Sequence, residues 1–527
     1  MKRAIFNTRQ LLALLATAAS TVAAYGAAPG ITGPTFNLIA QPAFLNQPDG
    51  NAVYSWGYGC NGSPSGYAPA AITNANCPTM QVPGPTLIVT EGQTVTVNLT
   101  NNLPTAAGNT SILFPGFNVT TTGGVTGIMT QEAAPGATVQ YKFTALSPGT
   151  RAYYSGTQGD LQIEMGLYGA IIVLPANVPS NCTSGLAAAN VLVEQAHGEH
   201  DFRLAASAYD HAKTCYDREY LFQFSEMDPN IHKAALAQAT ALSGCTAGAA
   251  GCSLEVPTEP YHPAYFLING RSMPDDMDTN YGAEYPHQPY NGNPHMHPGE
   301  QVLIRVIGQG RWQHPFHEHA NHVRILGRDG NLILSQTDPN SLAGPLMFTT
   351  TTTPGLAFDG IFYYTGRGLN WDMYAHNGAD PVGGTSHPNC VPDSNGYYTV
   401  NSVPPAPVTA INYYEWCADH LKPLEVAPFG DVGAGGPATL PNANILTNGV
   451  WYGGSPYLGP DATVRATGPN SDLQPFNTQG NPANERGFAF MWHSHNEREI
   501  TTNNVFPGGM LMMMLVDSRE FVIDESN

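Results

Sequence analysis

The sequence is short of charge, and of positive charge in particular. Only 11% of its 527 residues are charged, and 20 Lys and Arg stand against 40 Asp and Glu, giving a formal net charge of −20. A surface of this sign repels nucleic acid and anionic lipid and favours cations. The composition therefore argues against nucleic acid as a partner.

The sequence also lacks an apolar run of the roughly 20 residues that a membrane-spanning helix needs. Its beginning, MKRAIFNTRQLLALLATAASTVAAYGA, combines Lys2, Arg3 and Arg9 with a short apolar run and then small residues up to Ala28. This arrangement predicts a secretory signal peptide over residues 1–28. We expect a protein exported to the periplasm or the extracellular space, without membrane insertion.

None of the eight cysteines lies in a CxxC motif. An even number of cysteines in an exported chain favours disulfides over metal thiolates. Connectivity stays open at this stage, although proximity in the sequence favours three pairs: Cys60 with Cys77, Cys245 with Cys252, and Cys390 with Cys417.

Helix-like segments rich in Leu, Glu, Lys and Ala are few, whereas Gly (56) and Pro (44) are plentiful. Short β-branched runs bounded by Gly, Pro or Asn, such as GPTLIVT and GAIIVLP, follow one another between Pro83 and Pro175. The same pattern returns from NVLVEQAH to HVRILGRDGNLIL. It predicts an all-β fold of two sandwich domains, over residues 29–178 and 188–518.

Two segments of the second domain differ from this pattern. NIHKAALAQATALSG, which ends at Gly244, is the one convincing helix. Residues 376–485 are dense in Gly, Pro and Asn, and we expect them to form a long insertion. Loops of that length are uncommon in compact domains and are usually functional or poorly ordered.

Histidines alternate along two strand-like segments, HPFHEHANH and FMWHSHNE. Side chains at positions i and i+2 of a strand point to the same face. Two such strands side by side would place four imidazoles around one point, a nitrogen set that suits copper or zinc. The candidate metal ligands are therefore His317, His319, His493 and His495.

Other metal-binding residue types carry a weaker signal. The pairs His197 and His200, and His295 and His297, stand in polar or turn-rich text, so solvated loop histidines are the favoured interpretation. In GGMLMMMLV the methionines alternate as core residues of a strand do, and packing is favoured over thioether ligation for Met512, Met513 and Met514.

HPFHEH, the downstream WHSHNE and GGM, and the earlier GPTLIVTEGQTVTVNLTN and GLYGAIIVLP together resemble the multicopper oxidase family of cupredoxin-domain proteins. The resemblance covers most of residues 80–345 and 486–517. It implies tandem cupredoxin-like Greek-key β-sandwiches with long loop insertions, and copper as the cofactor. It also implies a small-molecule or metal substrate if the protein is active, and two-domain relatives suggest a homotrimer.

Positions carried over from the family assign roles to the histidines. The resemblance implies that His317 is the type 2 copper ligand and that His319, His493 and His495 are type 3 ligands. His314 matches the first histidine of the type 1 site.

The chain departs from the family at the remaining ligand positions. Ser494 stands in place of the type 1 cysteine, Glu499 in place of a histidine, and Met510 comes six residues later than the family's methionine. A serine hydroxyl is neither soft nor ionised at neutral pH, so we expect the blue copper site to be lost. In the first domain, non-ligating residues replace all four histidines: Leu113, Pro115, Tyr154 and Gly156.

Four remaining imidazoles are too few for a trinuclear cluster but suffice for a single copper. Glu318, Glu497 and Glu499 are either acceptors that orient the imidazoles or solvated carboxylates. Tyr153 or Tyr154 could approach the site from the first domain.

Three functions follow from the sequence as hypotheses. The first is an exported copper-binding protein that uses the two HxH pairs. The second is an active copper oxidoreductase with another electron route or an inter-subunit site, to which His197, His200, His295 or His297 of a neighbour could contribute. The third is a metal-free structural or interaction protein on a cupredoxin scaffold.

Overall fold

The computed structural model describes residues 27–184, 198–297, 300–364, 488–516 and 523–525. The predicted signal peptide up to residue 26, His197, the insertion at 376–485 and the pair Cys390 and Cys417 therefore lie outside the described residues.

The first half of the described chain forms two five-stranded sheets, in the orders β11-β12-β5-β1-β4 and β3-β2-β6-β10-β7, and a small β8-β9 ribbon. The strand bounds are β1 (Gly30–Thr32), β2 (Thr35–Asn46), β3 (Ala52–Cys60), β4 (Tyr67–Ala68), β5 (Gly84–Thr90), β6 (Thr94–Asn101), β7 (Thr120–Gly123), β8 (Val125–Thr126), β9 (Gln131–Glu132), β10 (Thr138–Thr144), β11 (Gly149–Tyr154) and β12 (Tyr168–Leu174). Short helical turns are η1 (Thr105–Ala107), α2 (Gly159–Gln162) and η2 (Ser180–Cys182).

The burial of these strands follows their sequences. Along β6, Val95, Val97 and Leu99 are buried and alternate with more exposed polar residues, as expected for a strand with one face on the core. In contrast, β12 is an apolar run that is buried almost throughout, because it lies between β11 and β5. The two sheets enclose a core that includes Trp56.

The second half forms two further sheets. β14, β13, β16, β22, β18 and β19 are hydrogen-bonded in this order, with β20 beside β18, and the other sheet has the order β15-β24-β23-β17-β21. The strand bounds are β13 (Arg218–Met227), β14 (Tyr265–Ile268), β15 (His295–Met296), β16 (Gln301–Gly308), β17 (His314–Glu318), β18 (Val323–Arg328), β19 (Asn331–Leu332), β20 (Leu346–Met347), β21 (Thr349–Thr352), β22 (Ala357–Tyr363), β23 (Phe488–Ser494) and β24 (Leu511–Val516). The turn η3 (Asp275–Met277) lies between β14 and β15.

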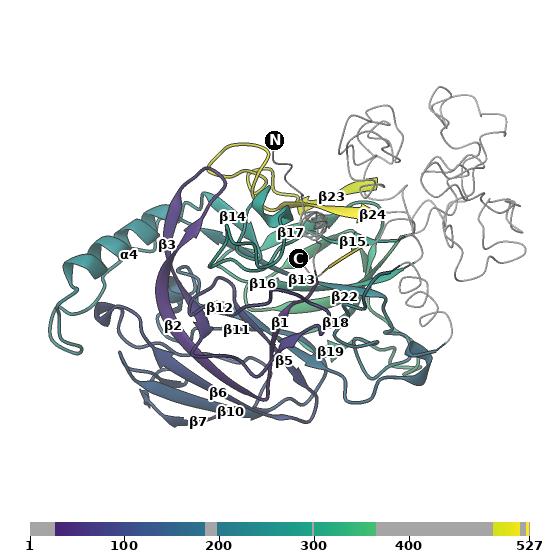
Figure 1. Cartoon of the computed structure of the whole chain (residues 1–527), viewed down its shortest axis with the longest axis horizontal. Helices are drawn as coiled ribbons and strands as arrows, with labels where there is room; N and C mark the ends of the chain where they lie inside the picture. Colours follow the sequence, from purple (N-terminus) through teal and green to yellow (C-terminus); the bar gives the residue numbers. More distant parts are fainter. Residues whose placement is uncertain (1–26, 185–197, 298–299, 365–487, 517–522, 526–527) are drawn as a thin grey trace, which may run out of the picture.

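The fold is thus all-β and consists of β-sandwiches, as the sequence predicted. Figure 1 shows the purple and blue strands of the first half below and to the left of the green and yellow strands of the second half. The division into domains at residues 178 and 188 stays a prediction. No helix among the described residues is long and apolar enough to cross a membrane.

The predicted helix is present as α4 (Pro229–Ala241). The Asp228 side chain caps it by accepting a hydrogen bond from the Asn230 N–H, and Pro229 occupies the first turn, where it costs no hydrogen bond. Its buried residues include Ile231, Ala235 and Ala239, at the spacing of one helix face. In Figure 1, α4 projects at the left beside β3.

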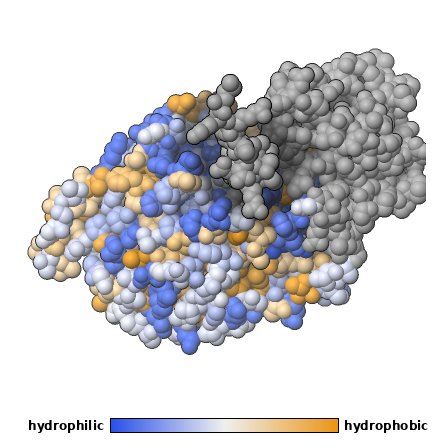
Figure 2. All heavy atoms as spheres, in the orientation of Figure 1, coloured by the Kyte–Doolittle hydropathy of each residue, from blue (hydrophilic) through white to orange (hydrophobic). Residues whose placement is uncertain are grey.

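Disulfides join Cys60 to Cys77 and Cys245 to Cys252, which confirms two of the predicted pairs, and a third joins Cys182 to Cys215. On the face shown in Figure 2, hydrophilic and hydrophobic residues are interspersed over the described part of the surface.

Candidate metal centre

The two histidine segments lie side by side. β17 and β23 pair in antiparallel fashion with His317 opposite His493 and Phe316 opposite Ser494. His319 and His495 follow directly after these strands, and the His495 N–H donates to the Pro315 carbonyl. The adjacency of the HxH segments that the sequence predicted is therefore present in the structure.

The four imidazoles form one cluster. The ring centroid of His317 lies 4.6 Å from that of His319, 5.6 Å from that of His493 and 5.0 Å from that of His495. His317 and His493 are buried, His319 is partly buried and His495 is exposed. The cluster is therefore enclosed on the strand side and open to solvent at His495.

One pair of ring nitrogens has the separation expected of two ligands on one metal. Nε2 of His319 lies 3.2 Å from Nε2 of His493. Imidazole nitrogens bind a first-row metal such as zinc at about 2.0 Å, so two of them at a tetrahedral angle are about 3.3 Å apart. Nδ1 of His493 donates to the Ser494 carbonyl oxygen over 2.7 Å, which leaves Nε2 as the lone-pair nitrogen of the neutral ring.

The surroundings keep these rings neutral. Burial lowers the pKa of His319, and repulsion from the other three imidazoles lowers it further, to about 3. Burial also lowers the pKa of His493. Because a metal binds the unprotonated nitrogen, both rings are in the form that ligation needs at neutral pH.

The cluster is not arranged as a closed metal cage. Among the residues that the structure describes, no three His, Cys, Asp or Glu side chains converge closely enough to hold a metal ion. Nδ1 of His317 lies 2.8 Å from the Thr349 hydroxyl. A third nitrogen would therefore reach a metal between His319 and His493 only after His317 or His495 turned its ring.

His314 lies in a separate environment, although it is on the same strand. Its Nδ1 is 2.9 Å from a Glu499 carboxylate oxygen and its Nε2 is 2.9 Å from a Glu226 carboxylate oxygen. Ser494 Oγ donates to the same Glu499 oxygen. Burial by itself lowers the pKa of His314, but the hydrogen bonds and charges of the two carboxylates outweigh it and raise this pKa to about 9. The four side chains form a buried ion network in which both imidazole nitrogens have carboxylate partners.

The carboxylates differ from one another in burial. Glu497 is exposed, in agreement with a solvated group, but Glu318 and Glu499 are fully buried, so the interpretation as surface carboxylates is wrong for these two. Glu318 accepts from the Thr350 hydroxyl over 2.8 Å, and burial raises its pKa well above the usual value. Sequence reasoning missed Glu226, although a Glu inside the apolar strand FQFSEM is a signal of a buried partner.

The first-domain positions where the family has histidines also come together. Leu113 and Tyr154 form an isolated β-bridge, and Gly156 packs so closely that a Cβ there would meet the Leu113 side chain. Tyr153 is buried, and its hydroxyl donates to the Pro85 carbonyl 2.7 Å away. This hydrogen bond directs Tyr153 into the first sandwich.

The weaker sequence signals have mixed outcomes. His200 is exposed, as predicted, but His295 and His297 are buried, so the prediction of solvated loop histidines is wrong for them. The reason is that His295 lies on β15, which pairs with β24 inside the molecule. Met512 and Met514 belong to the core, which confirms packing.

Residues 64–178 match a protein-family model described as multicopper oxidase. Curated relatives share part of this region. Multicopper oxidase MCE from Talaromyces pinophilus is 37% identical over 103 residues, 19% of this chain and 16% of that protein. Laccase-1 from Emericella nidulans is 36% identical over 111 residues, 20% of this chain and 17% of that protein. The matches thus span less than a fifth of these relatives.

Solved structures give a distant likeness over a larger part of the chain. The multicopper oxidase mgLAC is 15% identical with a TM-score of 0.43, over 92% of this chain and 86% of that one. A blue copper oxidase from Nitrosomonas europaea is also 15% identical, with a TM-score of 0.42, over 92% and 85% of the two chains.

Proposed function

We propose that this chain, which carries a multicopper oxidase domain at residues 64–178, is a copper-binding protein whose ligands come from His317, His319, His493 and His495. The observation that carries the proposal is the 3.2 Å separation of the Nε2 atoms of His319 and His493 across two paired strands. Neutral imidazoles are suitable ligands for copper. Among the divalent first-row metals, Cu²⁺ generally binds a given nitrogen site most tightly.

The chemistry of the donors argues against a blue, type 1 copper site. The residue between His493 and His495 is Ser494, whose hydroxyl donates a hydrogen bond to Glu499. His314, the other residue that the family resemblance assigns to a type 1 site, is held between two carboxylates. Because every cysteine among the described residues is in a disulfide, none of them offers a thiolate to the cluster, and copper held there would lack the intense absorption of a blue site.

Copper uptake by purified full-length protein tests the proposal. We expect the parent to retain copper after dialysis. We expect His319→Ala and His493→Ala to lower the affinity for copper by about tenfold or more, since the loss of a hydrogen-bond partner of a metal ligand already costs that much. The matched control is His200→Ala, since His200 is an exposed histidine outside the cluster. Equal copper retention by parent, cluster variants and control would contradict the proposal and favour a metal-free scaffold.

The exposure of His495 favours a second candidate, an active copper oxidoreductase. Copper bound at the cluster would supply one-electron chemistry. The chain's own contribution would be an open edge at His495, where a small-molecule or metal donor could reach the cluster without passing through a type 1 site. Oxygen consumption by the copper-loaded protein with phenolic or metal donors tests this candidate, and no turnover with bound copper counts against it.

We also propose that the protein is exported. Three disulfides are present among the described residues, and such bonds form and persist in oxidising compartments.

A further inference from the structure

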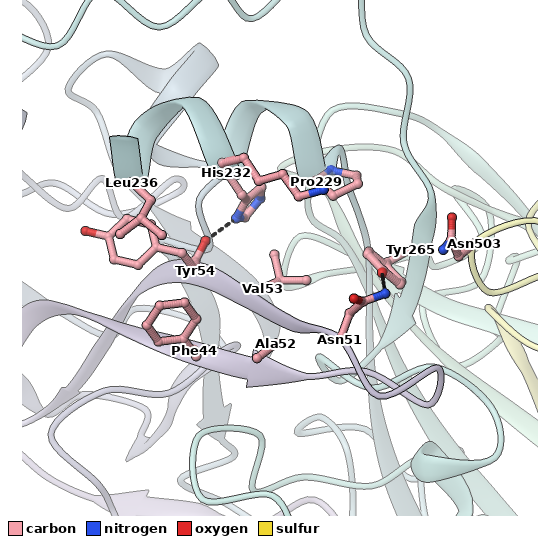
Figure 3. Close-up of a pocket in the computed structure, with 11 residues that line it drawn as sticks. Phe44, Asn51, Ala52, Val53, Tyr54, Pro229, His232, Leu236, Tyr265 and Asn503 are labelled. Carbon is pink, nitrogen blue, oxygen red and sulfur yellow. Dashed lines mark hydrogen bonds between the residues drawn. The ribbon is translucent and has the colours of Figure 1, made fainter. Parts of the chain in front are cut away.

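A small cavity lies between the helix α4 and the β2–β3 hairpin, and none of the cluster histidines lines it. Its volume is about 150 Å³, and Tyr265 of β14 and Asn503 of the loop after β23 close one side of it. Figure 3 shows the helix above the hairpin, with Leu236 and Tyr54 at one end and Tyr265 and Asn503 at the other. The lining residues are Phe44, Asn51, Ala52, Val53, Tyr54, Pro229, His232, Lys233, Leu236, Tyr265 and Asn503.

The size and walls of the cavity suit one aromatic ring. The rings of Phe44 and Tyr54 lie edge to face, with centroids 5.6 Å apart, and Val53 and Leu236 add aliphatic surface. Phe44 is 48% exposed, so its ring is open to a ligand as well as to solvent. An apolar cavity of about 150 Å³ is large enough to admit benzene. A single six-membered ring would therefore fill the space and cover Phe44.

The opposite end of the cavity presents hydrogen-bond acceptors. Asp49 accepts from the Asn51 amide nitrogen over 2.8 Å, from the Tyr265 hydroxyl over 3.0 Å and from the Asn503 amide nitrogen over 3.2 Å. A carboxylate can only accept, so each amide must turn its nitrogen to Asp49 and keep its carbonyl oxygen for another donor. Within the described part of the chain, no hydrogen bond uses the side-chain oxygens of Asn51 and Asn503.

We propose that this cavity binds a single-ring aromatic molecule that carries one hydroxyl or amino donor. The ring would lie between Phe44, Tyr54 and Leu236, and the donor would face the amide oxygen of Asn51. The negative charge of Asp49 behind the amides disfavours a carboxylate on the ligand at that end. Lys233 lies on the helix side with an exposed side chain, so its ammonium group can stay in water.

A protein side chain could compete for the same space. Val505 and Phe506, in the turn that begins near Asn503, are 64% and 66% exposed. A second copy of this chain could insert Phe506 into the cavity, and the experiment must separate this occupant from a small molecule.

Ligand-observed NMR on the full-length protein provides the test, with phenol and aniline as probes and benzoate and cyclohexanol as comparisons. Phe44→Ala removes one wall, and Ala52→Trp fills the space from an exposed position, so neither change disturbs the core. Leu146→Ala is the matched control, because Leu146 is 65% exposed but does not line the cavity.

We expect phenol and aniline to bind the parent and the control equally, and to bind both cavity variants about fivefold or more weakly, as the loss of about 1 kcal/mol requires. Benzoate and cyclohexanol should bind the parent more weakly by a similar factor. Binding unaffected by either cavity variant, equal binding of all four probes, or no binding at millimolar concentration would overturn the proposal. A concentration-dependent dimer that Phe506→Ala abolishes would also overturn it, in favour of a second copy.

Discussion

At the residue scale, the most informative feature is the buried network of Glu226, His314, Ser494 and Glu499. Glu226 lies on β13 and His314 on β17. Ser494 is the last residue of β23, and Glu499 lies in the loop after it, so the network joins these three strands. Glu499 also accepts from the Asn496 side chain over 2.9 Å. Since Ser494 lies between His493 and His495, we expect the network to hold the segment that carries these two histidines.

Replacing Glu499 by Gln tests the network. The amide cannot balance the charge of a protonated His314, so we expect Glu499→Gln to lower the free energy of unfolding by about 1–3 kcal/mol. Urea unfolding of the two proteins measures the difference. The matched control is Glu497→Gln, two residues away and exposed, which should change stability by less than about 0.5 kcal/mol. Similar losses in the two variants would show that the network does not contribute as described.

The sequence predicted individual histidines better than their partners. The alternation of His317 with His319 and of His493 with His495 is a local pattern, and the structure places these rings together. The partner Glu226 is 88 residues from His314, so no local spacing connects the two side chains. A contact of this kind depends on the order of the strands in space.

At the scale of elements, short β-branched runs with polar and apolar alternation predicted strands, and the segment NIHKAALAQATALSG predicted helix α4. What it could not predict is which strands become neighbours. β13 pairs in parallel with β16, about 80 residues later, and β2 pairs in parallel with β6. These registers depend on long-range packing of the sandwiches, which single-strand patterns do not encode.

The cap of α4 is an element whose stability can be tested directly. Asp228 accepts from the Asn230 N–H over 2.9 Å and from the His262 N–H over 2.8 Å. Removing both acceptors in Asp228→Ala should cost about 1–2 kcal/mol of stability. Asp228→Asn keeps a side-chain oxygen for the cap, and we expect a smaller loss in chemical denaturation. An equal loss in the two variants would contradict a capping role.

At the scale of the whole molecule, buried charges connect parts of the chain that are far apart in sequence. The Arg218 guanidinium pairs with Glu199 at 2.6 Å, with Glu300 at 2.7 Å and with Glu525 at 3.2 Å. The Ile523 N–H also donates to Glu199 over 2.9 Å. This cluster ties residues 523–525 to β13, with Arg218 at its centre and Glu199 between Arg218 and the Ile523 N–H.

Acid should weaken this connection. Burial alone would raise the pKa of Glu199, but the charges of Arg218 and His297 outweigh it and lower this pKa to about 2. Because the folded pKa lies below the unfolded value, the stability from Glu199 is present above about pH 4.5 and is lost as the pH falls toward 2.

We therefore expect the denaturation midpoint of the parent to fall more steeply between about pH 4.5 and about pH 2 than that of Glu199→Gln, which cannot take up this proton. The control is Glu255→Gln, an exposed carboxylate that should keep the parental slope. Parallel pH profiles for the parent and Glu199→Gln would exclude this role for Glu199.

The central claim, that imidazoles of the two paired strands hold copper, is tested most directly by electron paramagnetic resonance of the protein loaded with one equivalent of Cu(II). The account predicts a type 2 signal with nitrogen hyperfine structure, without an intense blue absorption band, because Ser494, between His493 and His495, offers a hydroxyl and not a thiolate. The nitrogen couplings should weaken in the double variant His319→Ala and His493→Ala. A signal that lacks nitrogen couplings, or one that this double variant leaves unchanged, would contradict the account.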